Sequence, residues 1–434
     1  MKRVVASIIA LVFALSSLYA QELDDLKKIP QDAGSFVKNL KESKHILETQ
    51  KKFKESYFSP WNMQKPNESL ENISWPFLSF KVGKSYGINL QLLKDEFFIE
   101  MYNNYNFDEY LLVSKKAITL KYTHLRALPT DRPIYRDPKK AGEGFPFDYL
   151  QNSSIAANKP LFVSHYSKDR EWVMVFSSFT NGWMKASDIV FVGDECTKKY
   201  QEAQQIFLLK DNIPLYSLKG KFLFHSRVGM MLKLLSEDKD NYTVLVVTRG
   251  DDISSPKYVK SHIPKNIASK KILRLSRDNF ESIIGEFVGT PYDWGGRYGD
   301  RDCSSLLRDM FLPFGIWLPR NSSHQSKVGK IISLKGLSDT QKLQRIKEKA
   351  IPFQTILYRK GHVLLYVGTY NGRVVVFHDV WGIRTKKDGV KGRIVVGKAL
   401  FSTLLLGQEQ EGYDIYNGHL RNLISMGIIT KEGE

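Results

Sequence analysis

The stretch that decides the fold reads Pro291-Tyr292-Asp293-Trp294-Gly295-Gly296, and Asp302-Cys303-Ser304 follows shortly after it. The turn-rich first part predicts that no helix continues through it, and Cys303 is predicted to open a helix that ends at Pro313. A helix N-terminus offers unpaired N–H groups and a partial positive charge, which lower the pKa of a cysteine placed there. A nucleophile needs such a thiolate, although a lone cysteine beside an apolar helix face is more often simply buried.

Two histidines downstream supply partners for that cysteine. His362 opens a predicted strand at 363–367, and His378 closes a predicted strand at 373–377. A cysteine nucleophile needs a base that later protonates the leaving amine, and that base needs a partner on its second ring nitrogen. If the strands form a hairpin, the two imidazoles lie at its open end and could fill both roles. The alternative is a pair of unrelated surface histidines.

The parity of this hairpin is a test of the pairing. A two-residue turn at Asn371-Gly372 would put His362 and His378 on opposite faces of the sheet. A five-residue loop at 368–372, or a bulge that restores even parity, would put both on one face. The catalytic interpretation therefore requires the loop or the bulge. It also requires the side chain of Cys303 to lie over that same face.

The chain before position 270 follows a different pattern. Residues 21–115 are predicted to be partly helical, with the pattern ending first at Ser59-Pro60-Trp61. Residues 116–195 and 196–268 contain short aromatic and β-branched runs separated by turn signals such as Asn181-Gly182, which predicts two consecutive small β-barrels. In residues 269–434 helices come first and strands follow, which predicts an α+β domain.

The N-terminus has the pattern of a secretory signal peptide. Lys2 and Arg3 precede an apolar run at 4–15, and small residues lead to Ala20. The run is too short for a comfortable membrane span, and Gln21 is not the cysteine of a lipid anchor. We therefore expect cleavage after residue 20, export to the periplasm or cell envelope, and no membrane span in the mature protein. An uncleaved anchor is the alternative.

Composition narrows the class of partner. The chain has 434 residues, with 64 Lys and Arg against 46 Asp and Glu, so its formal net charge is +18. Such a charge favours an anionic partner. An exported protein does not normally meet nucleic acid, so we expect an envelope polymer or a membrane face, and no nucleic acid. The sequence does not fix the oligomeric state, for which a monomer is the simplest expectation.

No cofactor is predicted. Two cysteines exclude a disulfide-built scaffold and a Cys-rich zinc module, and the nine histidines contain no H-E-x-x-H motif. The spacing of Gly392, Gly397 and Lys398 matches a phosphate loop, but Ala399 stands where the magnesium-binding hydroxyl should be. Cys196 follows two acids, and a disulfide between Cys196 and Cys303 is conceivable in an exported protein, although it would consume the nucleophile.

Four separate motifs together resemble the NlpC-type family of cell-wall cysteine peptidases: 291–296, 302–304, Leu318-Pro319-Arg320-Asn321-Ser322-Ser323-His324-Gln325 and Gly361-His362-Val363. The two β modules resemble the bacterial Src-homology-3-like barrels of a multidomain branch of that family, and residues 21–115 resemble its clip-like segment. The resemblance implies an α+β architecture: a papain-like peptidase domain at 269–434, preceded by two small Src-homology-3-like barrels and a partly helical segment.

The resemblance also implies a function. Members of the family hydrolyse the bond between γ-D-glutamate and a diamino acid in peptidoglycan stem peptides. It assigns Cys303 as nucleophile, His362 as base and His378 as the third residue. The residues expected to line the substrate cleft are Tyr292, Asp302, Ser304 and Ser322. Asp302 is the candidate to meet the free amine of L-alanine, and Ser305 replaces the glycine that many members have there.

Two other functions stay open at this point. The same cysteine chemistry could cut another bond, such as the amide that joins the glycan to L-alanine, or it could transfer an acyl group. Alternatively, the hydrolase domain could be inactive and the protein could bind peptidoglycan. The presence of Cys303, His362 and His378 together argues against an inactive enzyme.

Overall fold

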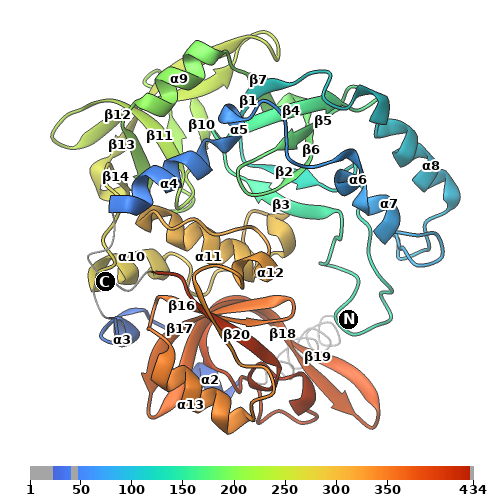
Figure 1. Ribbon diagram of the computed structural model, residues 1–434, viewed down its shortest axis with the longest axis vertical. Coiled ribbons are helices and arrows are strands. Elements are labelled where there is room, and N and C mark those ends of the chain that lie inside the picture. Colours follow the sequence, from blue (N-terminus) through green and yellow to red (C-terminus); the bar gives the residue numbers. More distant parts are fainter. Residues whose placement is uncertain (1–22, 41–46, 431–434) are drawn as a thin grey trace, which may run out of the picture.

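The computed structural model describes residues 23–40 and 47–430, and its elements are arranged as Figure 1 shows. The predicted signal peptide therefore lies outside the described residues. Within those residues, none of the helices combines the length and the apolar character that crossing a membrane requires.

The N-terminal segment is helical, as predicted. Its short helices α2 and α3 lie beside the C-terminal sheet, where the ring of Phe36 stacks on Phe401 with centroids 4.7 Å apart. The following helices run over the two β modules. The helices of the segment are α2 (Asp24–Lys28), α3 (Gly34–Val37), α4 (Leu47–Tyr57), α5 (Ser59–Asn62), α6 (Leu70–Ile73), α7 (Trp75–Ser79), α8 (Asp95–Asn104) and η1 (Phe107–Glu109).

The first β module is an antiparallel sheet with the order β3-β2-β6-β5-β4-β1-β7. Strand residues alternate between the two faces of this sheet, and both faces are apolar. Leu161 and Val173 pack inside the barrel, whereas Trp172 and Trp183 pack with Tyr105 of the N-terminal segment. The elements are β1 (Lys115–Thr119), β2 (Thr123–Arg126), β3 (Gln151–Ile155), β4 (Pro160–Tyr166), β5 (Trp172–Phe176), β6 (Asn181–Lys185), η2 (Ala186–Asp188) and β7 (Ile189–Phe191).

The turn predicted at Asn181-Gly182 is wrong. Both residues belong to β6, and the chain reverses at 177–180, where the hydroxyl of Ser177 accepts from the N–H of Thr180. Gly182 is required for another reason: a Cβ there would lie 2.8 Å from the carbonyl oxygen of Arg126 on the neighbouring strand. The glycine therefore marks a close approach of two strands.

The second β module has a five-stranded sheet with the order β13-β12-β11-β8-β14 and a separate hairpin of β9 and β10. Helix α9 connects it to the first module. Its elements are α9 (Asp194–Glu202), β8 (Gln205–Leu208), β9 (Pro214–Tyr216), β10 (Phe222–His225), β11 (Met231–Glu237), β12 (Asn241–Arg249), β13 (Pro256–Pro264), η3 (Lys265–Ile267) and β14 (Ala268–Ser269).

The C-terminal part is the predicted α+β domain. Its sheet has the order β15-β20-β16-β17-β18-β19, and α10 and α11 lie above it in Figure 1. The helices are α10 (Arg277–Gly285), η4 (Trp294–Gly296), α11 (Cys303–Phe311), η5 (Leu312–Phe314), α12 (Ser322–Gln325), α13 (Asp339–Lys349), η6 (Ile415–Asn417) and η7 (Leu420–Asn422). The strands are β15 (Lys330–Ser333), β16 (Thr355–Arg359), β17 (His362–Tyr370), β18 (Arg373–Lys387), β19 (Val390–Thr403) and β20 (Leu423–Ile428).

The two faces of this sheet are covered by different helices. Leu365, Phe377 and the residues in line with them pack against α10 and α11. Leu364 and Val376, which alternate with them, pack with Ile346 of α13 on the other face. The central strands β17 and β18 are thus buried on both sides near these helices, which positions α11 over the sheet.

The first β module is tied directly to the turn before α11. The side-chain amide of Gln151 donates to the carbonyl of Gly295 at 3.1 Å, and the indole N–H of Trp294 donates to the carbonyl of Asp148 at 3.0 Å. The module therefore forms part of the surroundings of the helix start.

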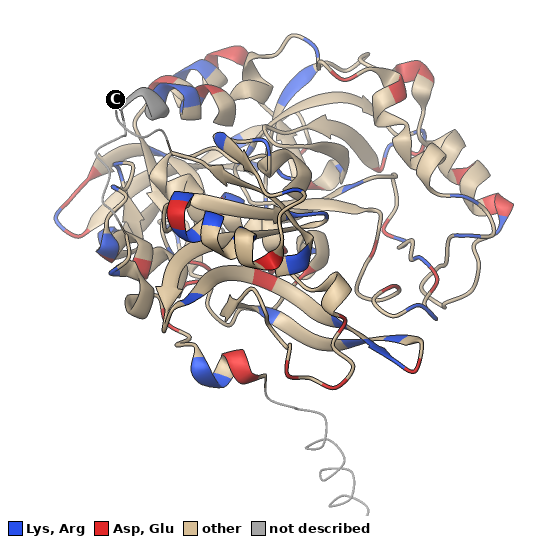
Figure 2. Ribbon diagram, turned by 60° about the horizontal axis from the view of Figure 1, so that its bottom comes forward, with Lys and Arg blue, Asp and Glu red and all other residues tan. Residues whose placement is uncertain are grey.

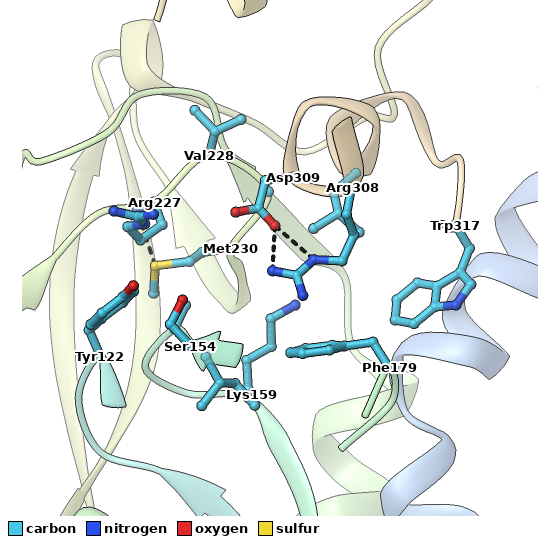
Figure 3. Close-up of a pocket in the computed structure, with 14 residues that line it drawn as sticks. Tyr122, Ser154, Lys159, Phe179, Arg227, Val228, Met230, Arg308, Asp309 and Trp317 are labelled. Atoms are coloured by element: carbon cyan, nitrogen blue, oxygen red, sulfur yellow. Dashed lines mark hydrogen bonds and ion pairs between the residues drawn. The ribbon is translucent and has the colours of Figure 1, made fainter. Parts of the chain in front are cut away.

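A small enclosed pocket lies where both β modules meet α11 (Figure 3). The guanidinium of Arg308 donates to Asp309, and the side chain of Lys159 points toward this pair. Burial, together with the positive charge of Arg308, lowers the pKa of Lys159 to about 7. The three parts of the molecule are therefore joined through a buried cluster of charges.

Candidate active site

Cys303 is the first residue of α11, where the sequence predicted a helix start. Asp302 is its N-cap: the carboxylate accepts from the backbone N–H of Ser305 at 2.9 Å, and the hydroxyl of Ser305 accepts from the backbone N–H of Asp302 at 2.9 Å. The side chain of Cys303 is only 7% exposed, and the backbone N–H of Val363 lies against its thiol. The helix start thus brings Cys303 to the first residues of β17.

The protonation of Cys303 differs from the expected thiolate. Burial, reinforced by the Asp302 carboxylate, raises the pKa of the thiol to about 12, against the smaller lowering effect of the Val363 N–H. A helix terminus contributes typically about 0.3–1 kcal/mol, whereas one pKa unit corresponds to about 1.4 kcal/mol, so desolvation dominates. Burial and the neighbouring His378 hold the pKa of His362 well below its usual range. The resting pair is a neutral thiol and a neutral imidazole.

The β17–β18 hairpin combines a two-residue turn with a β-bulge. Tyr370 pairs with Arg373, so the turn has two residues, and the register shifts between Tyr366 and Gly368. This bulge restores the even parity that the catalytic interpretation required. Nε2 of His362 consequently lies 2.8 Å from Nδ1 of His378.

A hydrogen-bond chain fixes the tautomers of the two histidines. Nε2 of His378 lies 2.9 Å from the hydroxyl of Ser402, and this hydroxyl donates to the carbonyl of Thr403 at 2.9 Å. Since its single proton is used there, the hydroxyl of Ser402 accepts from Nε2–H of His378. Nδ1 of His378 is then an acceptor for Nε2–H of His362. Nδ1 of His362 is left with a free lone pair, which is what a base requires.

The expectation that Cys303 lies over the same sheet face as the histidines is wrong. His378 has the parity of Val376 and so belongs to the face that packs against α13, whereas α11 covers the opposite face. Leu365–Phe377 is the last pair between β17 and β18, and the two strands no longer pair beyond it. Cys303 meets β17 there, at the backbone of Val363, rather than over one face.

Arg320, which the sequence did not mark as a functional residue, holds the side chains of Asp302 and Ser304 in place at the helix start. Arg320 donates to both carboxylate oxygens of Asp302, at 3.1 and 2.6 Å, and to the hydroxyl of Ser304 at 2.8 Å. Although burial opposes ionisation, Arg320 and the hydrogen bonds from Ser305 lower the pKa of Asp302 to about 2. Arg320 lies in the third motif, and the rule that a buried charge needs a partner could have linked it to Asp302.

Tyr292 and Ser322 have different surroundings. Tyr292 borders the histidines through a shared pocket, its ring is 6.0 Å from that of Trp381, and burial together with the nearby Cys303 raises its pKa well above the usual value. Ser322 opens α12, and its carbonyl accepts from the N–H of Ser326 at 3.0 Å. Among the described residues, no hydrogen bond joins Ser322 to Cys303 or to the histidines.

The pocket beside His362 has a volume of about 660 Å³. One wall belongs to the C-terminal domain and the other to the first β module, including Phe147 and Tyr149. His419 also lines it. This histidine is buried, its ring centroid is 5.1 Å from that of His362, and its Nδ1 has no hydrogen-bond partner in the described part of the chain. No motif marked His419 in the sequence.

The three histidines are the residues here that could hold a metal ion. His362, His378 and His419 each offer one ring nitrogen, and these atoms lie within 4.8 Å of one another. Imidazole is a common ligand of zinc and other transition metals. Cys196 takes no part in the site: both cysteines are free, so the conceivable disulfide between Cys196 and Cys303 is not formed.

Comparison with known proteins identifies four segments. Residues 289–379 match the NlpC/P60 family, and residues 6–110 match the N-terminal NLPC_P60 stabilising domain. Residues 133–185 match an SH3 domain of the SH3b1 type, and residues 194–239 match an SH3 domain of the SH3b2 type. The chain is 26% identical over 196 residues to a γ-D-glutamyl-L-lysine dipeptidyl-peptidase of Bacillus subtilis (strain 168), which covers 43% of this chain and 57% of that relative's length.

A solved structure shares the fold. An NlpC/P60 endopeptidase from Photobacterium damselae subsp. piscicida superposes with a TM-score of 0.80 at 23% identity, covering 93% of this chain and 97% of that one. An NlpC/P60 family protein from Bacillus cereus ATCC 10987 gives a TM-score of 0.46 at 18% identity, over 65% of this chain and 83% of that one. With its N-terminal stabilising domain and two SH3 domains ahead of the NlpC/P60 domain, the chain belongs to the NlpC/P60 family.

Proposed function

We propose that the protein is an exported cysteine endopeptidase that cleaves the γ-D-glutamyl–diamino acid bond of peptidoglycan stem peptides. One observation carries the catalytic part of this proposal. The base His362 is linked through His378 to Ser402, which leaves its Nδ1 unprotonated, at the strand end that Cys303 contacts.

Because Cys303 and His362 are both neutral at rest, the thiol must lose its proton as the sulfur attacks. As the sulfur of Cys303 attacks the γ-carbonyl carbon, its proton passes to Nδ1 of His362. Backbone N–H groups at the start of α11 are placed to hold the oxyanion. The imidazolium of His362 then gives this proton to the amine of the diamino acid as the C–N bond breaks. Water, deprotonated by the same imidazole, hydrolyses the thioester and releases the acyl product.

His378 acts through His362. Burial lowers the pKa of His378 to about 3, so it stays neutral when His362 gains a proton. Its Nδ1 lone pair can then stabilise the imidazolium of His362 by accepting from Nε2–H. This is the role that the third residue of a nucleophile–base–orienting triad performs.

The cleft residues take different roles in this proposal. Tyr292 lines the cleft beside Cys303, and Ser322 is kept as a candidate for contact with a longer substrate. The lone pairs of Asp302 are occupied by Arg320, Ser304 and Ser305. We therefore propose that Asp302 and Ser304 fix the helix start, in place of the predicted contact between Asp302 and the amine of L-alanine.

The division of the chain also remains a proposal: a signal peptide at 1–20, a clip-like segment at 21–115, barrels at 116–195 and 196–268, and the peptidase at 269–434. Residues of the first barrel form one wall of the pocket beside His362, among them Phe147 and Tyr149. Such a wall limits the bulk of the substrate, which favours released stem peptides with a free N-terminus over intact wall. We propose a monomer.

The experiment is digestion of defined muropeptides, with and without glycan, followed by mass spectrometry of the products. The proposal expects L-alanyl-D-glutamate and a new free amine on the diamino acid, and no product with Cys303→Ala. A new free amine on L-alanine would instead indicate an amidase. Activity that persists in Cys303→Ala would rule out the cysteine mechanism.

A further inference from the structure

Three arginines form one wall of the pocket beside His362. Arg384 of β18 and Arg393 of β19 are directly opposed in the register of these strands. Arg359 ends β16, where it is paired with His362 at the start of β17. The side chains of Arg359 and Arg384 both donate to Asn417, at 3.0 Å to its carbonyl and 3.1 Å to its side-chain oxygen. The three guanidinium groups therefore converge.

Burial and the neighbouring Arg384 lower the pKa of Arg393, and the carboxylate of Glu143 opposes this only in part. None of the three arginines forms an ion pair with a described carboxylate. Two carboxylates line the same pocket, but Glu143 accepts from the hydroxyl of Tyr149 at 2.7 Å, and Asp414 accepts from the amide of Asn417 at 2.6 Å. The buried Nε–H groups of Arg359 and Arg393 have no acceptor. Like charges directly opposed on neighbouring strands destabilise a sheet, so this arrangement costs free energy in the empty protein.

The first β module encloses the wall. Gly142 has φ +80°, and a Cβ there would overlap the guanidinium of Arg393. Arg136 of the same module stacks over Tyr149 at 4.3 Å from the ring centroid. Figure 2 shows further Lys and Arg residues on both strands of the β18–β19 arm. Arg393 is thus held between two domains, whereas Arg384 is exposed at the edge of the pocket.

Resting on the proposed function, we propose that the arginine cluster (Arg359, Arg384 and Arg393) binds the free carboxylate at the far end of the diamino acid side chain. The leaving amine must lie beside His362 to receive its proton, so the diamino acid occupies this part of the pocket. Guanidinium groups bind carboxylates with paired, charge-assisted hydrogen bonds. A diaminopimelate residue carries this distal carboxylate and a lysine residue does not. The cluster therefore makes the site selective for stem peptides of the diaminopimelate type.

The test is a binding measurement that needs no catalysis. Full-length protein with Cys303→Ala is titrated calorimetrically with L-alanyl-γ-D-glutamyl-meso-diaminopimelate, with the lysine tripeptide and with the tripeptide amidated at the distal carboxylate. We expect the diaminopimelate peptide to bind at least about tenfold more tightly than the other two. Added Arg393→Gln or Arg384→Gln should remove this difference. Lys391→Gln removes a charge from the exposed part of β19 and should keep it.

The outcomes separate the two proposals. Equal binding of all three peptides, or a preference that survives in both arginine variants, would overturn the carboxylate site. Arg384→Gln should also raise the melting temperature of the empty protein, because it relieves like-charge repulsion, so lost binding cannot be ascribed to misfolding. If the wild-type protein cleaves no stem peptide while Cys303→Ala still discriminates, the proposed reaction fails and the carboxylate site stands.

Discussion

The hydroxyl of Ser402 determines the tautomer of His378, 2.9 Å away, because that hydroxyl donates its only proton to the carbonyl of Thr403. The consequence reaches His362, whose Nε2 must then donate to His378 at 2.8 Å. If the hydroxyl pointed to His378 instead, both histidines would adopt the opposite tautomer. Nδ1 of His362 would carry a proton and could not accept one from Cys303. A serine two strands away from His362 therefore sets the direction of proton transfer in the proposed mechanism.

Replacing Ser402 with alanine should lower kcat about ten- to a hundredfold with little change in KM. The variant leaves Nε2–H of His378 buried without a partner and lets the inactive tautomer form. Ser402→Thr retains the hydroxyl and should restore most of the activity. Steady-state kinetics on a defined muropeptide give both constants. The control is Thr403→Val, whose lost hydroxyl contacts Asp25 rather than His378. An equal loss in both variants would indicate a general packing effect.

Alkylation of Cys303 by iodoacetamide should be slow at pH 7 and should rise about tenfold per pH unit up to pH 9. The thiolate is the reactive species, and a pKa raised to about 12 leaves little of it at neutral pH. Mass spectrometry of labelled peptides gives the rates of Cys303 and Cys196 in the same sample. The sequence alone predicts the opposite, with Cys303 reacting far faster than Cys196. A fast rate for Cys303 that does not change between pH 6 and 8 would support that thiolate–imidazolium pair.

The local features of the site were predictable, and the reason is their short range. Cys303 opens a helix because turn residues precede it and Asp302 caps it, all within a few positions. The sequence predicted the bulge in β17 only as an alternative to a five-residue loop. Asn39 donates to the carbonyl of Val367 at 3.2 Å, and Gly368 beside it leaves room for the Asn39 side chain. The bulge therefore occurs beside a contact between two residues that are 328 positions apart. A local sequence pattern cannot reveal such a contact.

The electrostatics of the site depend on tertiary burial. Arg320 and Asp302 are 18 positions apart. From the sequence alone, the carboxylate of Asp302 was expected to bind substrate, whereas in the structure it is paired with Arg320. The pKa of Cys303 is likewise raised, first by its burial in the folded protein and then by the carboxylate of Asp302. A sequence shows which groups ionise, whereas the folded structure decides the cost of removing them from water.

Asp302→Asn should destabilise the protein by about 3–5 kcal/mol at pH 7, because it leaves the buried guanidinium of Arg320 without a counter-charge. The pKa of Asp302 is lowered to about 2 in the folded state, against about 4 in an unfolded chain. Its stabilising contribution is therefore complete above pH 4 and is lost as the pH falls from about 4 to 2. Urea unfolding of both proteins at pH 7 and pH 3 should show a smaller difference at pH 3.

The same variant tests the role of Asp302 toward substrate. If Asp302 only fixes the helix start, Asp302→Asn should reduce kcat/KM by the same factor on stem peptides with a free and with an acetylated N-terminus. A loss confined to the free-amine peptide would restore the amine-binding role that the sequence suggested.

Micromolar Zn²⁺ should inhibit the enzyme, and a chelator should reverse the inhibition. Nitrogens of His362, His378 and His419 lie within 4.8 Å of one another, and small ring rotations bring such atoms to the 2.0–2.1 Å that zinc requires. A bound ion would occupy lone pairs that the proposed proton transfer needs. His419→Asn should weaken the inhibition at least tenfold, whereas His324→Asn, at an exposed position on α12, should not. Cobalt added to Cys303→Ala should give visible absorption bands that disappear in the double variant with His419→Asn. Bands that persist there, or unchanged inhibition in His419→Asn, would place the metal elsewhere.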